Sequence, residues 1–289
     1  MDQPGKVRLV LVLVTGIMAV CCGSIFIRLA AAPALAVAAY RVSWATVILT
    51  PLVVPGPVRE LSPLSRKGWG LLILSGAALA LHFALWIASL SYTSVASSVL
   101  LVDTTPFFVG VAGQWLLGRP ARRAFWIGLA IAFLGCILIF WGDLSLSQDS
   151  TRGNLLALGG AVAVSVYMLV GSRARQSLSL LAYVWPVYGV SALMLLAVCY
   201  ISGTPLGGFP PKTHLFMFLL GLVPQCIGHT TYNWSLRWLP ARVVAMVSLA
   251  EPVGASLLAW MILHENLTGT KLAGGLVVLS GIYFATRER

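Results

Sequence analysis

The chain has 289 residues, of which 59% are hydrophobic and only 9% are charged. A soluble domain carries about 25% charged residues, so most of this surface faces lipid rather than water. The formal net charge is +11, but the basic residues stand singly or in short groups between long apolar runs, which indicates interfacial Lys and Arg and excludes a nucleic-acid-binding surface.

The apolar runs are long enough to cross a membrane. A spanning helix needs about 20 mostly apolar residues. Ten stretches meet this requirement, and we expect helices over 9–28, 34–54, 69–90, 94–117, 123–141, 154–172, 179–201, 214–235, 241–263 and 270–286. The connections between them are short. The sequence therefore predicts an all-α integral membrane protein with ten transmembrane helices and no separate soluble domain.

The basic residues are unevenly distributed between the two faces of the predicted bundle. With ten spans both termini lie on one face, and the basic residues of that face are Lys6, Arg8, Arg59, Arg66, Lys67, Arg119, Arg122, Arg123, Arg173, Arg175, Arg237, Arg242, Arg287 and Arg289. The opposite face carries Arg28, Arg152, Lys212 and Lys271. Because cytoplasmic loops are rich in Lys and Arg, this bias predicts a protein of the cytoplasmic (inner) membrane with both termini in the cytoplasm.

The fourth and fifth spans match the ninth and tenth without gaps. The matched pairs share a constant spacing of 146 residues, and they are Pro106 with Pro252, Gly128 with Gly274 and Gly135 with Gly281. Small residues on one helix face let helices pack closely in lipid, and proline bends a helix. Since each half has five helices, the halves enter the membrane from opposite sides. We therefore expect two inverted repeats, residues 1–145 and 146–289, with a binding site near the membrane midplane.

One motif recurs around these prolines and glycines. It reads Tyr92-Thr93-Ser94, Pro106, Gly118-Arg119-Pro120, Gly128 and Gly135 in the first half, and Glu251-Pro252, the turn 264–268, Gly274 and Gly281 in the second. With this motif the chain resembles the drug/metabolite transporter superfamily, in particular its EamA-type permeases, and most of all the ten-helix bacterial amino-acid exporters. The resemblance implies a secondary transporter or facilitator that exports small organic metabolites, amino acids (aromatic or apolar ones included), by alternating access.

The turn after each proline-containing helix departs from that family in one half. The family usually has an acidic residue there, which Glu265 provides in the second half and Arg119 replaces in the first. We therefore expect Glu265 to cap or fix the tenth helix and to have no part in transport.

Polar residues within the third and eighth spans are candidates for a solute site. His82 and Trp86 lie one turn apart on one helix face, and Gln225, His229 and Tyr232 repeat the arrangement in the span that the inverted repeat relates to the third. Histidine can hydrogen-bond or carry a proton, and tryptophan offers a stacking surface. The alternative is a histidine bonded to a neighbouring helix and a tryptophan that only packs.

Ionisable side chains within a membrane are rare without a pathway, a partner or a cavity. Glu251 directly precedes Pro252, where the helix has a free carbonyl, so its carboxylate suits a substrate ammonium or a proton that alternates with substrate. The alternative is a buried structural carboxylate. For Arg41 and Asp103 we expect a structural ion pair.

Several aromatic residues lie deeper than an interfacial belt requires and could line a solute pocket. They are Tyr40, Trp86, Tyr167, Trp185 and Trp234. Packing in the core predicts the same pattern, so both interpretations stay open.

Motifs for catalysis and for an ATP motor are absent from the sequence. It contains no HExxH, Walker A or GxSxG motif, so we expect no catalytic residue, no metal site and no cofactor. Transport would then run on gradients, and the midplane acids and histidines permit proton coupling. The expected partners are a small-molecule solute, membrane lipid and, where transport is proton-coupled, protons.

Three alternative functions remain beside amino-acid export. An antiporter of phosphorylated or nucleotide-linked solutes would need several inward Lys or Arg, and only Arg41 qualifies. A membrane enzyme acting on lipid or prenyl phosphate would gather acids and bases at one face, and a passive channel would need a continuous polar pore. The exact substrate, the direction of transport, the coupling, the resting conformation and the oligomeric state stay open at this level.

Overall fold

The computed structural model describes residues 4–118, 120–141, 150–264 and 266–287, and all regular structure within them is helical. The first half contains α1 (Lys6–Ala30), α2 (Ala34–Val53), the short turn η1 (Pro57–Leu61), α3 (Arg66–Ser89), α4 (Val95–Val102), α5 (Thr105–Leu117) and α6 (Arg123–Phe140). The second half contains α7 (Ser150–Ala174), α8 (Leu180–Ile201), α9 (Pro211–Leu220), η3 (Gly221–His229), α10 (Thr230–Ser235), α11 (Ala241–Ser248), α12 (Glu251–Leu263) and α13 (Gly269–Thr286). Arg119 and Glu265, on which the loop prediction rests, lie outside the described residues.

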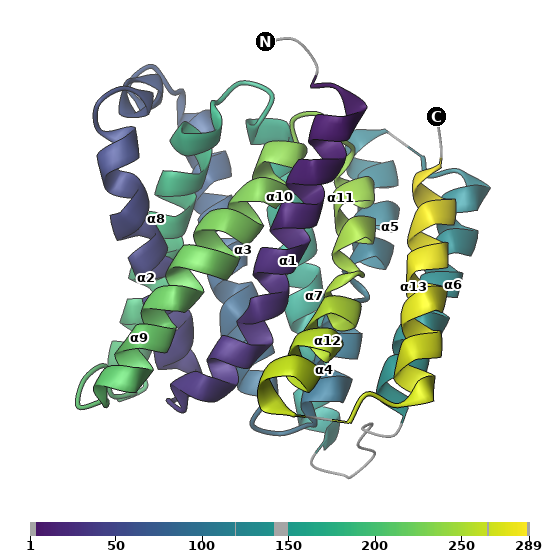
Figure 1. Cartoon of the computed structure of the whole chain (residues 1–289). Helices are drawn as coiled ribbons and strands as arrows, with labels where there is room; N and C mark the ends of the chain where they lie inside the picture. The colour runs from purple at the N-terminus through teal and green to yellow at the C-terminus, as the bar shows by residue number, and fades with distance from the viewer. Residues whose placement is uncertain (1–3, 119, 142–149, 265, 288–289) are drawn as a thin grey trace.

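The helices run between two faces of a bundle, and both ends of the chain lie at the same face (Figure 1). Nine segments of the described chain are long and apolar enough to cross a membrane. The tenth predicted pass is divided between α4 and α5, which follow one another across the bundle (Figure 1). The prediction of an all-helical membrane protein with ten passes is therefore confirmed.

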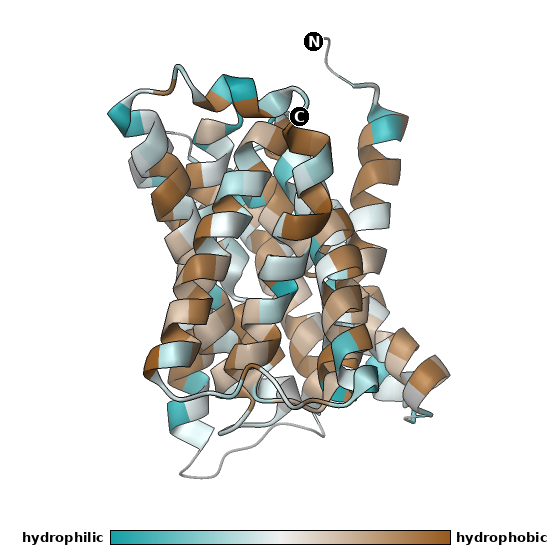
Figure 2. Ribbon diagram, turned by 90° about the vertical axis from the view of Figure 1, so that its left-hand side faces the viewer, coloured by the Kyte–Doolittle hydropathy of each residue, from teal (hydrophilic) through white to brown (hydrophobic). Residues whose placement is uncertain are grey.

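The outward surface of the bundle is apolar along most of its height. Figure 2 shows hydrophobic residues along the helices and hydrophilic ones concentrated toward the two ends. Large apolar side chains such as Leu155, Leu193 and Leu276 are exposed. Lipid is the environment in which such a surface is stable.

Two passes are interrupted at equivalent places, and proline explains both interruptions. Pro106 and Pro252 lie in the first turns of α5 and α12. A proline ring collides with the carbonyl group four residues earlier. Those earlier residues are Val102 and Ser248, which are the last residues of α4 and α11.

The packing of the helices follows the inverted repeat. Helix α3 packs on α7, and the equivalent segment α9–η3–α10 packs on α1. The last helices of the two halves, α6 and α13, pack on each other and stand side by side in Figure 1. Each of these contacts joins one half to the other, so neither half buries its apolar helix faces alone.

The four repeated glycines lie in the seam between α6 and α13. A Cβ atom added at Gly128 would lie 2.6 Å from the carbonyl oxygen of Gly281, and one added at Gly274 would lie 2.7 Å from the carbonyl oxygen of Gly135. Real Cβ atoms do not come this close to backbone atoms. Glycine therefore sets how closely the two helix backbones approach.

The eighth pass contains a π-helical segment that the sequence did not predict. Nine residues, Gly221–His229, form η3 between two α-helical parts. Pro224 lies within it, four residues after Leu220, the last residue of α9. π-helical segments are rare and are frequently found at functional sites.

Candidate functional site

A small cavity lies at the centre of the bundle, where both interrupted passes meet η3. Its volume is about 60 Å³, and its polar lining residues are Arg41, His82, Trp86, Asp103, Thr105, His229, Tyr232, Ser248 and Glu251. These side chains come from five different passes. Five of the ten residues predicted as substrate-binding line it: His82, Trp86, His229, Tyr232 and Glu251.

Arg41 is buried and held by contacts that the sequence did not predict. Its Nε atom donates to Oε1 of Gln225 at 2.8 Å, and its guanidinium group lies 4.3 Å from the centre of the Phe83 ring. Its Nη2 atom is buried and has no hydrogen-bond partner among the described residues. Leaving a buried donor unsatisfied costs about 1–3 kcal/mol, and more when the group is charged.

The predicted ion pair between Arg41 and Asp103 is wrong in this structure. Within the part of the chain that the structure describes, Asp103 Oδ2 is buried without a hydrogen-bond partner, and Arg41 is bound by Gln225 instead. The reason is placement: Asp103 caps the end of α4, whereas Arg41 lies on α2 and faces η3. Both residues line the cavity as separate groups.

Glu251 and Asp103 lie at the two helix interruptions. Asp103 follows the last residue of α4, and Glu251 is the first residue of α12. The backbone carbonyl oxygen of Glu251 accepts a hydrogen bond from Cys21 of α1, at 3.6 Å. Two carboxyl groups from opposite halves thus line one cavity, together with the guanidinium group of Arg41.

The aromatic wall of the cavity comes from α3 and η3. The rings of His82 and Trp86 are stacked, with centroids 5.8 Å apart and an interplanar angle of 10°. His82 Nδ1 also lies 2.9 Å from the carbonyl oxygen of Gly160 on α7. A hydrogen bond to a neighbouring helix is what the alternative interpretation of His82 predicted. Trp86 Nε1 and the Tyr232 hydroxyl are buried, and no described residue forms a hydrogen bond with either.

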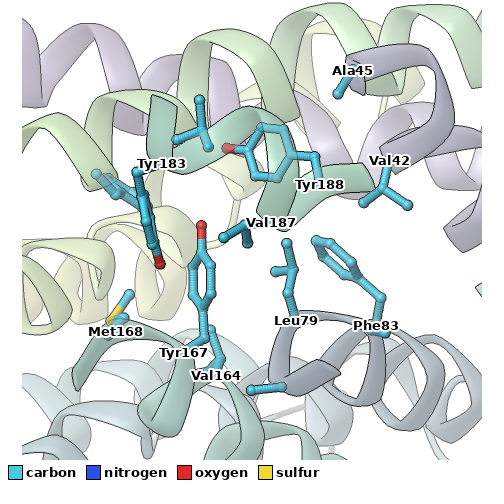
Figure 3. Close-up of a cluster of buried hydrophobic side chains, with 14 of the residues drawn as sticks. Val42, Ala45, Leu79, Phe83, Val164, Tyr167, Met168, Tyr183, Val187 and Tyr188 are labelled. Carbon is cyan, nitrogen blue, oxygen red and sulfur yellow. The ribbon is translucent and has the colours of Figure 1, made fainter. Parts of the chain in front are cut away.

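Behind this wall lies a polar network of which the sequence analysis had singled out only Tyr167. Figure 3 shows Tyr167, Tyr183 and Tyr188 directing their hydroxyl groups toward a common region of the core. Asn233 Nδ2 donates to the Tyr167 hydroxyl at 2.5 Å, and Tyr188 Oη lies 3.1 Å from the hydroxyl of Thr230. The spacing of Asn233, four residues after His229 on the same helix face, was the signal that could have found it.

The remaining predicted residues do not line the cavity and have other partners. The Tyr40 hydroxyl donates to the carbonyl oxygen of Leu206 at 2.5 Å. Trp185 Nε1 donates to Thr50 Oγ1 at 3.0 Å. Trp234 lies under the guanidinium group of Arg8. Tyr167 and Gln225 are buried beside the cavity, where they hold Asn233 and Arg41.

A second, larger cavity, here called the vestibule, opens at the face that carries the termini. It has a volume of about 620 Å³ and lies between α5, the end of α7 and the turn from α10 to α11. Val109 and Leu169 line its inner part. They lie next to Thr105 and Met168 of the central cavity, about one turn or less along the same helices. At the opposite face the halves are joined by a hydrogen bond from Thr93 Oγ1 to Asn154 Oδ1, at 3.0 Å.

Ten passes in two inverted halves, with interrupted helices meeting at a charged central cavity, define a multi-pass membrane protein of the secondary-transporter type. The sequence model of the EamA-like transporter family matches the chain twice, over residues 7–141 and 151–287. The chain therefore belongs to the EamA-like transporter family.

Curated relatives and a solved structure agree with this assignment. The uncharacterized transporter YwfM of Bacillus subtilis (strain 168) is 27% identical over 221 residues, which is 74% of this chain and 72% of that protein. A probable amino-acid metabolite efflux pump of Salmonella typhimurium is 24% identical over 227 residues, 75% of this chain and 74% of its own length. A crystal structure with 18% identity has a TM-score of 0.84 over 98% of this chain and 97% of the other, which shows the same fold.

Proposed function

We propose that this protein exports zwitterionic metabolites, amino acids first, by alternating access across the cytoplasmic membrane. One observation carries the proposal. The central cavity presents a buried guanidinium donor, Arg41 Nη2, and a buried carboxylate acceptor, Asp103 Oδ2, neither of which has a hydrogen-bond partner among the described residues. A solute with one carboxylate and one ammonium group would satisfy both.

The surroundings of these atoms favour the same chemistry. Arg41 Nη2 suits the carboxylate of an amino acid, because a charge-assisted hydrogen bond to a carboxylate is about twice as strong as a neutral one. Helices α5 and α12 begin beside the cavity, at Thr105 and Glu251, and helix N-termini attract negative charge. Asp103 and Glu251 then remain for the ammonium group.

The aromatic wall supports an apolar or aromatic side chain on the solute. His82 and Trp86 present a stacked pair of rings, and Trp86 Nε1 is an additional buried donor. Aromatic rings stack on such a surface with a gain of about 0.5–1.5 kcal/mol beyond their area burial.

Transport requires the central cavity to widen. A water molecule needs about 10–15 Å³ of such space, so about 60 Å³ accommodates a few waters and no amino acid. The interruptions at 103–104 and 249–250 and the π-helical η3 are where the bundle can bend without breaking a regular helix. The vestibule gives access from the face of the termini, and the excess of basic residues on that face supports a cytoplasmic location for it.

The second candidate, an antiporter of phosphorylated solutes, finds less support in the central cavity. Arg41 is the only Lys or Arg among the described residues that line it, against two carboxyl groups. A phosphate carries nearly two negative charges at neutral pH and would be repelled by Asp103 and Glu251. The related proteins of known name are transporters, and no observation favours an enzyme or a channel.

The test uses purified protein in liposomes that are preloaded with a mixture of amino acids and nucleotides. Protein-dependent release of each solute is followed with and without a pH gradient, and empty liposomes measure leakage. We expect selective release of zwitterionic amino acids, which a pH gradient changes if protons are coupled. Each released amino acid is then compared with its amide, in which a neutral carboxamide replaces the carboxylate. We expect the amide to be released more slowly because it offers no carboxylate for Arg41 to bind. Release of nucleotides alone, or of all solutes equally, would contradict the proposal.

A further inference from the structure

The vestibule is lined by three arginines, and the central cavity does not account for them. Arg173 comes from the end of α7, Arg237 from the turn after α10, and Arg242 from the first turn of α11. No Asp or Glu is among the described residues that line this cavity of about 620 Å³. Ser172 and Gln176 add neutral hydrogen-bonding groups to the same wall.

Specific contacts place Arg237 at the wall of the vestibule. The guanidinium group of Arg237 lies 5.4 Å from the centre of the Trp238 ring, and its backbone carbonyl oxygen accepts from Gln176 Nε2 at 3.5 Å. Arg237 and Arg242 are both half-buried. The buried Arg175 lies nearby: burial lowers its pKa to about 10, and the charge of Arg237 lowers the pKa in the same direction.

Concavity distinguishes these residues from the other basic residues of the same face. Arg59, Arg66 and Lys67 lie around η1 and the start of α3 and do not line the vestibule. Like charges inside a low-dielectric hollow focus their potential, whereas charges on a convex surface are screened by water and salt. The vestibule should therefore attract anions more strongly than its surroundings do.

We propose that the vestibule is an anion-binding site, in which Arg173, Arg237 and Arg242 hold a carboxylate or phosphate group at the mouth of the transport path. Arginine is suited to this role because its planar guanidinium group binds such oxygens in pairs. The group comes either from a dissolved solute on its way to the central cavity or from the headgroup of an anionic lipid. The site does not depend on which solute crosses the membrane.

The local potential can be measured by chemical modification of a single introduced cysteine. Ser172→Cys places a thiol in the vestibule wall, and Ser62→Cys places one on the same face, beside the basic residues around η1 but outside the vestibule. Each full-length variant is reconstituted in phosphatidylcholine nanodiscs and treated with a negatively and a positively charged methanethiosulfonate reagent of similar size. Protein without an introduced cysteine measures modification of the native thiols.

We expect the ratio of the two rates, negative over positive, to be on the order of tenfold higher at position 172 than at position 62. The double variant Arg237→Gln, Arg242→Gln should lower the ratio at position 172 until it is close to the ratio at position 62. Arg173→Gln alone should lower the ratio at 172 in part, and because Arg173 is exposed this variant keeps the test valid if the double variant misfolds. Equal ratios at positions 172 and 62 in the protein that keeps all three arginines would overturn the proposal.

Two further arms separate the sources of the anion. Glutarate and inorganic phosphate are added to the phosphatidylcholine nanodiscs, and a parallel sample contains phosphatidylglycerol without added anions. If the soluble anions slow modification of position 172 by the negatively charged reagent, the site binds a solute. If phosphatidylglycerol slows the same reaction at position 172, the site binds a lipid headgroup. No change in either arm would overturn anion binding. Since none of these readouts involves transport, they stand apart from the test of amino-acid export.

Discussion

A buried arginine that has one satisfied and one unsatisfied nitrogen is poised to bind an anion. Gln225 fixes the orientation of Arg41 through Nε, and the Phe83 ring lies against the guanidinium plane. Another donor, Nη2, is buried without a hydrogen-bond partner among the described residues and is left for a ligand. This arrangement lets the charge stay in the membrane interior without a permanent carboxylate partner, which would compete with a solute.

Replacing Arg41 should therefore weaken carboxylate recognition. We predict that Arg41→Gln raises the KM for amino acids by roughly tenfold to a hundredfold, since a hydrogen bond to a charged group contributes about 1.5–3 kcal/mol. Transport of the corresponding amides should change much less. Arg152→Gln is the matched control, because Arg152 lies against the Tyr92 ring and away from the cavity. Equal losses for amino acids and amides would contradict the role of Arg41 in carboxylate binding.

The carboxyl group of Glu251 should matter for flux rather than for folding. We predict that Glu251→Gln lowers the rate of solute release several-fold while expression stays near normal, because the amide keeps the size of the side chain but cannot carry a negative charge. Asp103→Asn provides the comparison at the equivalent helix interruption. Wild-type release by the Glu251→Gln protein would show that the carboxylate has no part in transport.

Most of the ionisable side chains in the site could be predicted from sequence, but their partners could not. Glu251, His82 and Arg41 stand out because ionisable residues in apolar runs are rare. Whether Arg41 meets Asp103 or Gln225 depends on the rotation of two helices about their axes. In this chain the π-helical η3 sets that rotation for Gln225, and nothing in a pattern of single residues reveals it.

At the scale of elements, proline ends helices and glycine allows helices to pack closely. Pro106 and Pro252 end the preceding helices at Val102 and Ser248, so that the cavity is built from helix ends. The sequence located these prolines but predicted unbroken spans, because steric conflict with the carbonyl four residues earlier was read as a bend. Glycine, in contrast, brings α6 and α13 into backbone contact.

A bulky residue in this seam should destabilise the protein. We predict that Gly128→Leu or Gly274→Leu lowers the midpoint of thermal unfolding in lipid nanodiscs, because overpacking costs about 1–3 kcal/mol or more where backbone atoms block the new side chain. Gly70→Leu in α3 is the control, since a Cβ atom there would meet nothing within 4 Å. Equal midpoints for the Gly128→Leu and Gly70→Leu proteins would show that α6 and α13 can separate without loss of stability.

At the scale of the whole molecule, each half packs its helices against the other half. Such mutual packing allows the two halves to exchange conformations. The contacts of α3 with α7 and of α1 with α9–η3–α10 are equivalent under the inverted repeat. One arrangement leaves the vestibule open at the face of the termini. Exchange of conformation between the halves would close that vestibule and open the opposite face.

The count of helices and the two-half plan follow from sequence because both depend on hydrophobicity and on repeats. Which face is open depends on packing differences between near-equivalent halves and had to be read from the structure.

A contact between the two halves at the opposite face gives the sharpest test of alternation. Thr93 belongs to the first half and Asn154 to the second, and their side chains lie at hydrogen-bond distance, 3.0 Å. We predict that oxidation of the double variant Thr93→Cys, Asn154→Cys forms a disulfide that stops solute release from liposomes, and that reduction restores it. The two single variants, oxidised in the same way, should transport normally, which excludes damage to the native cysteines. Since a disulfide forms only when the Cβ atoms approach to about 3.5–4.5 Å, its formation itself reports the closed arrangement. Undiminished release by the cross-linked protein would mean that solute leaves without opening between these two residues, and alternation of the halves at this face would have to be abandoned.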